Sequence, residues 1–162
     1  MIRDATVSDA RRLAEITLDG WQRGYVGIVP DEVLARQRID RHLAYFASRE
    51  TMIAPMRTLV AEVGGRVVGY THGGPVRPES GESLDGAELW GMYVDPSHGG
   101  HSWALLTAME DHFRTDGHEV AYLWVLRDNT HARTFYEAAG WALDHRWERI
   151  EPLPQVRYQL NL

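Results

Sequence analysis

The sequence contains no cysteine in its 162 residues, and this absence sets the first limits on its chemistry. Disulfide bonds, thiolate zinc sites and cysteine nucleophiles are all excluded. No apolar run is long enough to cross a bilayer, and the first residues, MIRDATVSDARR, lack the apolar core of a signal peptide. We therefore expect a cytoplasmic protein with no membrane partner.

An excess of positive charge is also missing. Lys and Arg number 17 against 23 Asp and Glu, which gives a formal net charge of −6. A nucleic-acid-binding surface needs clustered basic residues, so we expect no nucleic-acid partner. The densest basic run, at 36–41, is interrupted by Asp40 and fits the outer face of a helix. An acidic protein attracts cationic molecules such as amines, although this tendency is weak.

The length and the 44% hydrophobic content fit one domain, residues 1–162, with a substantial core. Alternation and β-rich runs predict strands at 2–5, 58–63, 66–70, 88–94, 120–126, 141–150 and 156–160. Helical periodicity and capping residues predict helices at 8–18, at 31–39 continuing or restarting through 42–48, after the turn at 97–101, and at 130–139. The segment 20–30, GWQRGYVGIVP, is typical of a loop or a broken helix, and 75–86 is a polar loop.

This order of elements contains no repeats and predicts an α/β domain. Two strand–helix–strand units, at 88–126 and 120–150, imply parallel pairing locally. The pair Gly64–Gly65 between two β-rich runs predicts an antiparallel hairpin. We expect one mixed sheet with helices on both faces.

A glycine-rich turn, SHGGHSW at 97–103, separates a predicted strand from an amphipathic helix. Glycines between a strand and a helix amino terminus are a common way to hold phosphate. The turn lacks the G-x-G-x-x-G spacing of a dinucleotide loop. His98 and His101 could ligate a metal, but no third ligand is near them in the sequence, so we expect no metal site.

The order of elements and three stretches together resemble the GNAT superfamily of acyl-CoA-dependent N-acetyltransferases. The stretches are 20–30, the strand and turn ELWGMYVDP at 88–96, and LWVLRDNTHARTFYEAAGW at 123–141, which contains N-x-x-A-x-x-F-Y-x-x-x-G-W. The resemblance covers nearly the whole chain. It implies a mostly antiparallel sheet with a central parallel strand pair, and transfer of acetyl from acetyl-CoA to a primary amine by direct attack in a ternary complex.

The resemblance also implies roles for particular residues. Asn129 would contact the coenzyme, and Tyr136 would give a proton to the departing CoA thiolate. The alternatives are that Asn129 caps a helix and that Tyr136 is a core aromatic residue. A backbone N–H of Met92, Tyr93 or Val94 would polarise the acetyl carbonyl.

The turn departs from the family pattern R/Q-x-x-G-x-G/A. Alignment from Pro96 places Gly99 at the basic position and Ser102 at the middle glycine. Alignment from the helix shortens the loop, places Gly100 and Ser102 at the two small positions, and puts Ser97 where Arg or Gln is expected. We prefer the second alignment because core periodicity is harder to violate than loop length.

In both alignments the arginine is missing. Loss of one charge-assisted hydrogen bond would cost about 1.5–3 kcal/mol, which weakens CoA binding by roughly ten- to a hundredfold. Backbone donors at Gly99, Gly100, His101 and Ser102 would still bind the pyrophosphate. His98 or His101, when protonated, could partly replace the arginine.

An alkylamine acceptor must lose a proton before it attacks. Glu88 is the first candidate for the base, with an exposed strand-end carboxylate as the alternative. His72 is the second candidate, with an ordinary surface or core histidine as the alternative. Trp21, Tyr25, His72 and Trp90 are the candidates for binding the acceptor, which could be a polyamine, an aminoglycoside, an amino acid or a peptide amine.

A second reading of the sequence is a degenerate relative with weak or lost CoA binding that acts as a binding or regulatory module. The segment from Asn129 to Tyr136 favours an active enzyme, whereas the altered turn favours the degenerate relative. A homodimer is compatible with either reading.

Overall fold

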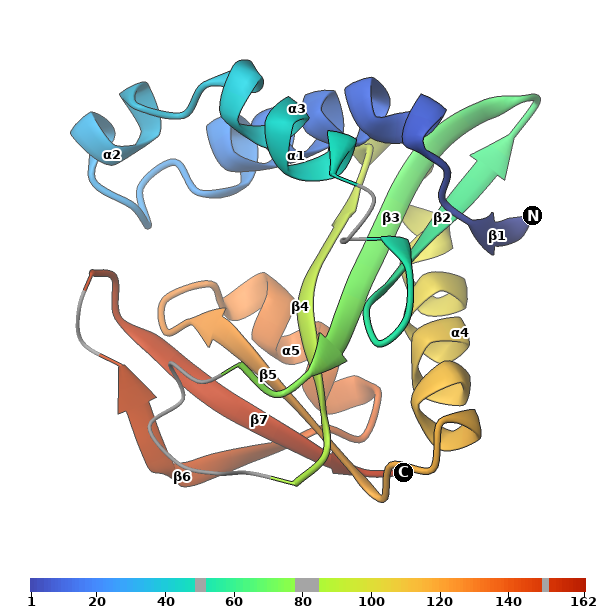
Figure 1. Cartoon of the computed structure of the whole chain (residues 1–162). Coiled ribbons are helices and arrows are strands. Elements are labelled where there is room, and N and C mark those ends of the chain that lie inside the picture. The colour runs from blue at the N-terminus through green and yellow to red at the C-terminus, as the bar shows by residue number, and fades with distance from the viewer. Residues whose placement is uncertain (49–51, 78–84, 150–151) are drawn as a thin grey trace.

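A computed structural model describes residues 1–48, 52–77, 85–149 and 152–162 (Figure 1). The strands are β1 (Ile2–Asp4), β2 (Arg57–Val63), β3 (Arg66–Pro75), β4 (Ala87–Val94), β5 (Val120–Leu126), β6 (Ala142–Arg149) and β7 (Gln155–Asn161). The α-helices are α1 (Ala10–Gly24), α2 (Asp31–Ala35), α3 (Ile39–Ala47), α4 (Ser102–Thr115) and α5 (Thr130–Ala138). Short 3₁₀ helices precede α1, at Val7–Asp9, and α4, at Pro96–His101.

The described strands form one sheet of order β1-β2-β3-β4-β5-β7-β6. Every neighbouring pair is antiparallel except β4 and β5, which are parallel. The predicted mixed, mostly antiparallel sheet with a central parallel pair is therefore confirmed. The second predicted parallel pairing is wrong, because β7 lies between β5 and β6 and pairs antiparallel with both.

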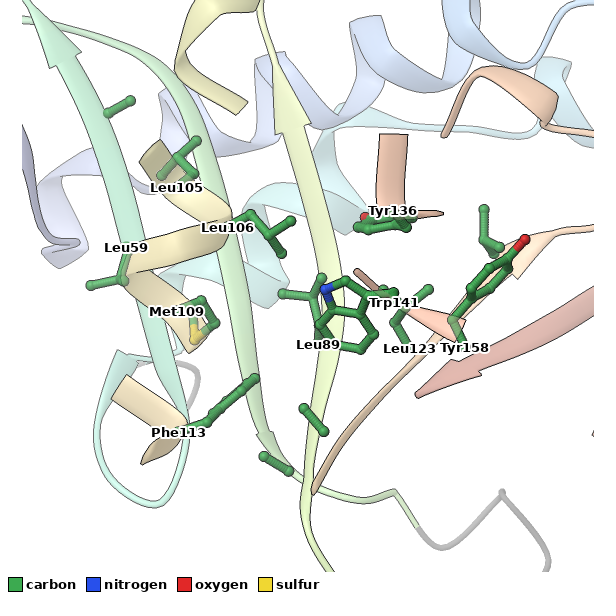
Figure 2. Packing of buried hydrophobic residues seen from close by; sticks show 14 of the residues in the cluster. Leu59, Leu89, Leu105, Leu106, Met109, Phe113, Leu123, Tyr136, Trp141 and Tyr158 are labelled. Carbon is green, nitrogen blue, oxygen red and sulfur yellow. The ribbon is translucent and has the colours of Figure 1, made fainter. Parts of the chain in front are cut away.

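Helices cover both faces of the sheet, as predicted. On one face, α4 and α5 pack on side chains from the central strands, including Leu59, Leu89 and Leu123 (Figure 2). On the opposite face, α1 and α3 pack on alternate residues of the same strands, including Val60 and Tyr70. The first face is called the α4/α5 face below, and the second the α1/α3 face.

Local signals in the sequence set most element ends correctly. Gly64 and Gly65 have φ values of 56° and 78°, and they join β2 to β3 in the predicted hairpin. The predicted end of the first helix at residue 18 is wrong, because α1 continues to Gly24. Gly20 does not break this helix; a Cβ there would lie 2.5 Å from Cδ1 of Tyr93, so glycine allows the helix to approach that ring.

The helical region after α1 and the loop after β3 differ from the predictions or lie partly outside the described residues. The predicted helix over 31–48 is split into α2 and α3, with residues 36–38 outside both. The predicted polar loop at 75–86 and the end of the strand at 150 lie partly outside the described residues. Within the described ranges, none of the helices combines the length and the apolar character that a membrane span requires.

Candidate active site

Strands β4 and β5 separate in the middle of the sheet. They pair only from Ala87 to Leu89 on β4, although β4 continues to Val94 (Figure 1). On the other side of β4, the register with β3 shifts, so that His72 pairs with Gly91 and Gly73 pairs with Leu89. Trp90 is the extra residue of this β-bulge. The gap between β4 and β5 therefore begins at the bulge.

The peptide groups of β4 beyond the bulge alternate between β3 and the gap. The N–H of Asp95 donates to the Val68 carbonyl at 2.7 Å, which fixes the side that faces β3. Tyr93, two residues earlier, therefore also directs its peptide group toward β3. The N–H groups of Met92 and Val94 point into the gap.

The turn after β4, Pro96–His101, is 3₁₀-helical with a kink at His98 (φ −131°, ψ 29°), and it runs directly into α4. Its glycines are not required by the backbone, because neither Gly99 nor Gly100 has a positive φ. A Cβ built on either one would meet no atom within 4 Å. Two adjacent glycines that the fold does not need leave open space for a ligand at the amino terminus of α4.

The polar side chains of the turn bond with one another. The Asp95 carboxylate accepts from the Ser97 N–H at 3.1 Å and from the Ser97 hydroxyl at 2.6 Å. Nδ1 of His98 lies 2.9 Å from the same hydroxyl, and Nδ1 of His101 donates to the His98 carbonyl at 3.0 Å. Arg12 donates to Asp95 at 3.1 Å. The Ser97 bonds and, after them, Arg12 lower the pKa of Asp95.

Asn129 and Tyr136 lie at opposite ends of α5. The side-chain oxygen of Asn129 accepts from the Ala132 N–H at 3.1 Å, so Asn129 does cap the helix. Its amide N–H₂ donates to none of the described residues. Capping and ligand contact are therefore compatible, because they use different atoms of the side chain.

Tyr136 is 9% exposed and packs against Phe135 and Trp141 (Figure 2). None of the described residues forms a hydrogen bond with its hydroxyl, and the hydroxyl oxygen is not closed off from solvent. Burial raises the pKa of Tyr136, and the nearby Tyr25 raises it further. Tyr25 is the residue that follows the last turn of α1.

The four predicted acceptor-binding residues belong to one aromatic group. Trp21 and Tyr25 on α1 stack edge-on at 5.0 Å, and His72 and Trp90 stack edge-on at 5.8 Å. Two tyrosines that the sequence reasoning did not assign to acceptor binding link these pairs. The Tyr25 hydroxyl lies 3.1 Å from that of Tyr93, and Tyr70 stacks with both Tyr93 and His72.

His72 is a buried, neutral histidine at the centre of this group. Its exposed fraction is 9%, and Tyr45 and Phe46 of α3 also contact its ring. Burial, helped by the charge of Arg77, lowers the pKa of His72 to about 3. Its imidazole is therefore uncharged at neutral pH and can accept a hydrogen bond.

Glu88 is fully buried, so the alternative of an exposed strand-end carboxylate is wrong. Arg77 holds both of its oxygens: Nε donates at 2.9 Å and Nη2 also donates to Oε1, while the Arg77 backbone N–H donates to Oε2 at 2.8 Å. Sequence reasoning missed Arg77 because it lies in a stretch without periodicity. The signal that could have found it is that a buried carboxylate needs a cationic partner.

In the part of the chain that the structure describes, no three His, Asp or Glu side chains gather as they would around a metal ion. One cavity, of about 210 Å³, is lined by Asp4, Arg57 and His112 together with Met52, Ala54 and Met56. None of the predicted site residues lines this cavity.

Comparison with known proteins identifies the family. The chain is 26% identical to the uncharacterized N-acetyltransferase YuaI of Bacillus subtilis. The matched 139 residues cover 77% of the relative and 85% of this chain. Its fold matches the PaiA N-acetyltransferase of Thermoplasma acidophilum, crystallised with coenzyme A, with a TM-score of 0.78 and 18% identity over 100% of this chain and 98% of that one. It also matches YncA of Salmonella typhimurium, a putative acetyltransferase crystallised with acetyl-CoA, with a TM-score of 0.74 and 23% identity over 100% and 93% of the two chains. The model of the acetyltransferase (GNAT) family matches residues 18–141, and the chain belongs to this family of enzymes.

Proposed function

We propose that this enzyme transfers the acetyl group of acetyl-CoA to a primary amine by direct attack in a ternary complex. The observation that carries the proposal is Tyr136: its ring is buried in the core, whereas its hydroxyl bonds to none of the described residues and is not closed off from solvent. An accessible hydroxyl without a protein partner is free to donate to a ligand.

The residues present fit acetyl-CoA as the co-substrate. The gap offers peptide groups of β4 to an extended chain such as pantetheine, as an exposed sheet edge does for a peptide. The space beside Gly99 and Gly100 suits a pyrophosphate at the helix amino terminus, where backbone N–H groups of the turn, through His101 and Ser102, can donate. The amide N–H₂ of Asn129 supplies a further donor. When bound, acetyl-CoA supplies an activated acyl carbonyl with a thiolate leaving group.

The chain's own groups then serve the transfer. The N–H groups of Met92 and Val94 stabilise negative charge on the carbonyl oxygen while the amine nitrogen bonds to the carbonyl carbon. The carbon–sulfur bond breaks, and the Tyr136 hydroxyl gives its proton to the departing sulfur. Tyr136 is protonated at neutral pH, as any tyrosine with an ordinary pKa of about 10 would be, and burial raises its pKa further. The remaining acceleration comes from holding the two reactants together.

The proton of the amine needs an acceptor. His72 is neutral at neutral pH, and its Nε2 lies 3.0 Å from where a Cβ on Gly91 would be, next to the bulge. Glu88 is the other candidate, although both of its oxygens already accept from Arg77. With a pKa of about 3, His72 cannot keep the proton at neutral pH, so we assign it to accept a hydrogen bond from the amine while the proton passes to water, and we assign Glu88 to the orientation of Arg77.

The shortened turn without arginine favours one other function, a binding module that has lost acetyl transfer. Calorimetric titration with acetyl-CoA, followed by a thiol-release assay over a panel of amines, separates the two. We expect measurable binding and amine-dependent release of CoA. No heat at high micromolar acetyl-CoA would refute the enzyme proposal, and binding without release by any amine would favour the binding module.

A further inference from the structure

The α1/α3 face of the sheet carries arginine–carboxylate pairs beside the gap. Leu89 and Leu123 pair in register and point into the core beneath α4 and α5. Their neighbours Glu88 and Tyr122 also pair in register, and therefore point to the opposite face. Trp124 lies on this face too, opposite Arg157 of β7.

The buried carboxylates of this face are already neutralised. Glu88 is bound by Arg77, and Asp144 lies 2.6 Å from Nη2 of Arg157. A third arginine, Arg149, lies over the Trp124 ring with 4.1 Å from its guanidinium carbon to the ring centroid. Among the described residues of this face, a polycationic acceptor therefore finds no buried carboxylate without an arginine.

Arg77 is the guanidinium whose geometry leaves an edge open. Of its five N–H groups, Glu88 takes one on Nε and one on Nη2, and none of the described residues accepts from Nη1. The side chain is 37% exposed, whereas that of its partner Glu88 is fully buried. Glu88 thus holds the edge formed by Nε and Nη2, and the edge formed by Nη1 and Nη2 has no acceptor on Nη1 among the described residues.

This open edge lies next to the reacting centre. The guanidinium carbon of Arg77 is 5.8 Å from the ring centroid of Trp90, the residue of the β4 bulge at which the gap begins. Trp90 in turn stacks on His72. Arg77 and His72 therefore both lie beside Trp90, and the charge of Arg77 acts on His72, so an acceptor whose amine reaches His72 lies on the same side of the sheet as the guanidinium.

We propose that the acceptor carries a carboxylate close to its amine, and that Arg77 binds this carboxylate through the open Nη1–Nη2 edge. A carboxylate matches a guanidinium edge with two parallel hydrogen bonds, which gives orientation as well as affinity. The inference rests on the proposed acetyl transfer and narrows its acceptor to an amino acid or a similar amino acid-like amine.

The test compares matched acceptors in a thiol-release assay: standard L-amino acids, their carboxamides, and spermidine as a polycation. We expect the kcat/KM of the best amino acid to exceed that of its carboxamide by more than about tenfold. Arg77→Gln should lower kcat/KM for the acid by roughly ten- to a hundredfold and change it little for the carboxamide. Arg77→Lys keeps the positive charge but not the two parallel donors of the guanidinium. Its kcat/KM for the acid should lie between those of the parent and Arg77→Gln.

The ratio of acid to carboxamide within one variant cancels general damage from an unpaired Glu88. Arg114→Gln is a matched control on the exposed side of α4, where Arg114 pairs with Asp111, and should leave the ratio unchanged. Three outcomes would overturn the inference but not the proposed acetyl transfer. The enzyme could use acid and carboxamide equally well, Arg77→Gln could leave their ratio unchanged, or the enzyme could acetylate spermidine and none of the amino acids. Failure to bind acetyl-CoA would overturn both.

Discussion

Replacing both glycines of the turn with alanine should separate the stability of the fold from its ligand binding. Gly99 and Gly100 lie in a 3₁₀ helix without positive φ, and a Cβ on either meets nothing within 4 Å. Alanine is favoured over glycine in helical backbone by about 0.5–1 kcal/mol. The double variant should therefore be about 1–2 kcal/mol more stable than the parent, which corresponds to roughly 2–4 °C in Tm for each kcal/mol.

The same change should weaken acetyl-CoA binding. If the pyrophosphate lies against this backbone, two methyl groups would push it away from the N–H donors. Loss of one charge-assisted hydrogen bond costs about 1.5–3 kcal/mol, or roughly ten- to a hundredfold in Kd. Urea unfolding of the free protein measures the first effect, and calorimetric titration with acetyl-CoA measures the second.

Gly64 provides the opposite control. It lies at the tip of the β2–β3 hairpin with a φ of 56°, so Gly64→Ala should cost about 1–2 kcal/mol of stability. Acetyl-CoA affinity of the folded Gly64→Ala protein should be unchanged. A turn variant that is less stable than the parent would refute the backbone argument, and one that binds acetyl-CoA normally would remove the turn as the pyrophosphate site.

Three further predictions concern single side chains. Tyr136→Phe should lower kcat about a hundredfold with nearly unchanged acetyl-CoA affinity, and an unchanged kcat would remove Tyr136 as the acid. Asn129→Ser keeps a capping oxygen, so calorimetry should show weaker acetyl-CoA binding, whereas urea unfolding should show stability close to that of the parent; equal binding would leave Asn129 as a cap alone. For His72, burial lowers the folded-state pKa to about 3, so below its ordinary pKa of about 6.5 the unfolded chain binds a proton that the folded chain does not. The free energy of unfolding should therefore fall by about 2 kcal/mol from pH 7 to pH 5 because of His72 alone. Urea unfolding of His72→Gln should not show this part of the loss. The same pH dependence of stability in the parent and in His72→Gln would contradict the prediction.

Signals that act within a few residues were sufficient to predict most of the fold. The Gly64–Gly65 hairpin and the almost purely apolar run of β5 do not depend on distant parts of the chain. The position of β7 between β5 and β6 could not be predicted in this way, because strand order depends on which edges meet in the folded sheet. The full length of α1 was missed for a similar reason, since Gly20 is explained by its contact with Tyr93.

The sequence predicted the coenzyme side of the candidate site better than its acceptor side. Asn129 and Tyr136 share one helix with a fixed spacing, so a sequence pattern can identify them together. Arg77 and Glu88 meet only because β3 and β4 pair, and the burial of Glu88 is a property of the whole sheet. In our proposal the acceptor is selected by such contacts between elements, which explains why the sequence left the acceptor open.

The charge around the turn bears on how a family member can lack the usual arginine. An anionic ligand beside Gly99 and Gly100 lies near Asp95, whose carboxylate would repel it if unpaired. Asp95 accepts two hydrogen bonds from Ser97 and one from Arg12, which reaches the turn from α1 and lies 3.1 Å away. Arg12 also donates to the Val67 carbonyl, so its position is fixed by the fold. The turn thus has an arginine nearby that offsets the local negative charge, and the proposed phosphate site relies on backbone donors rather than on a basic side chain of its own.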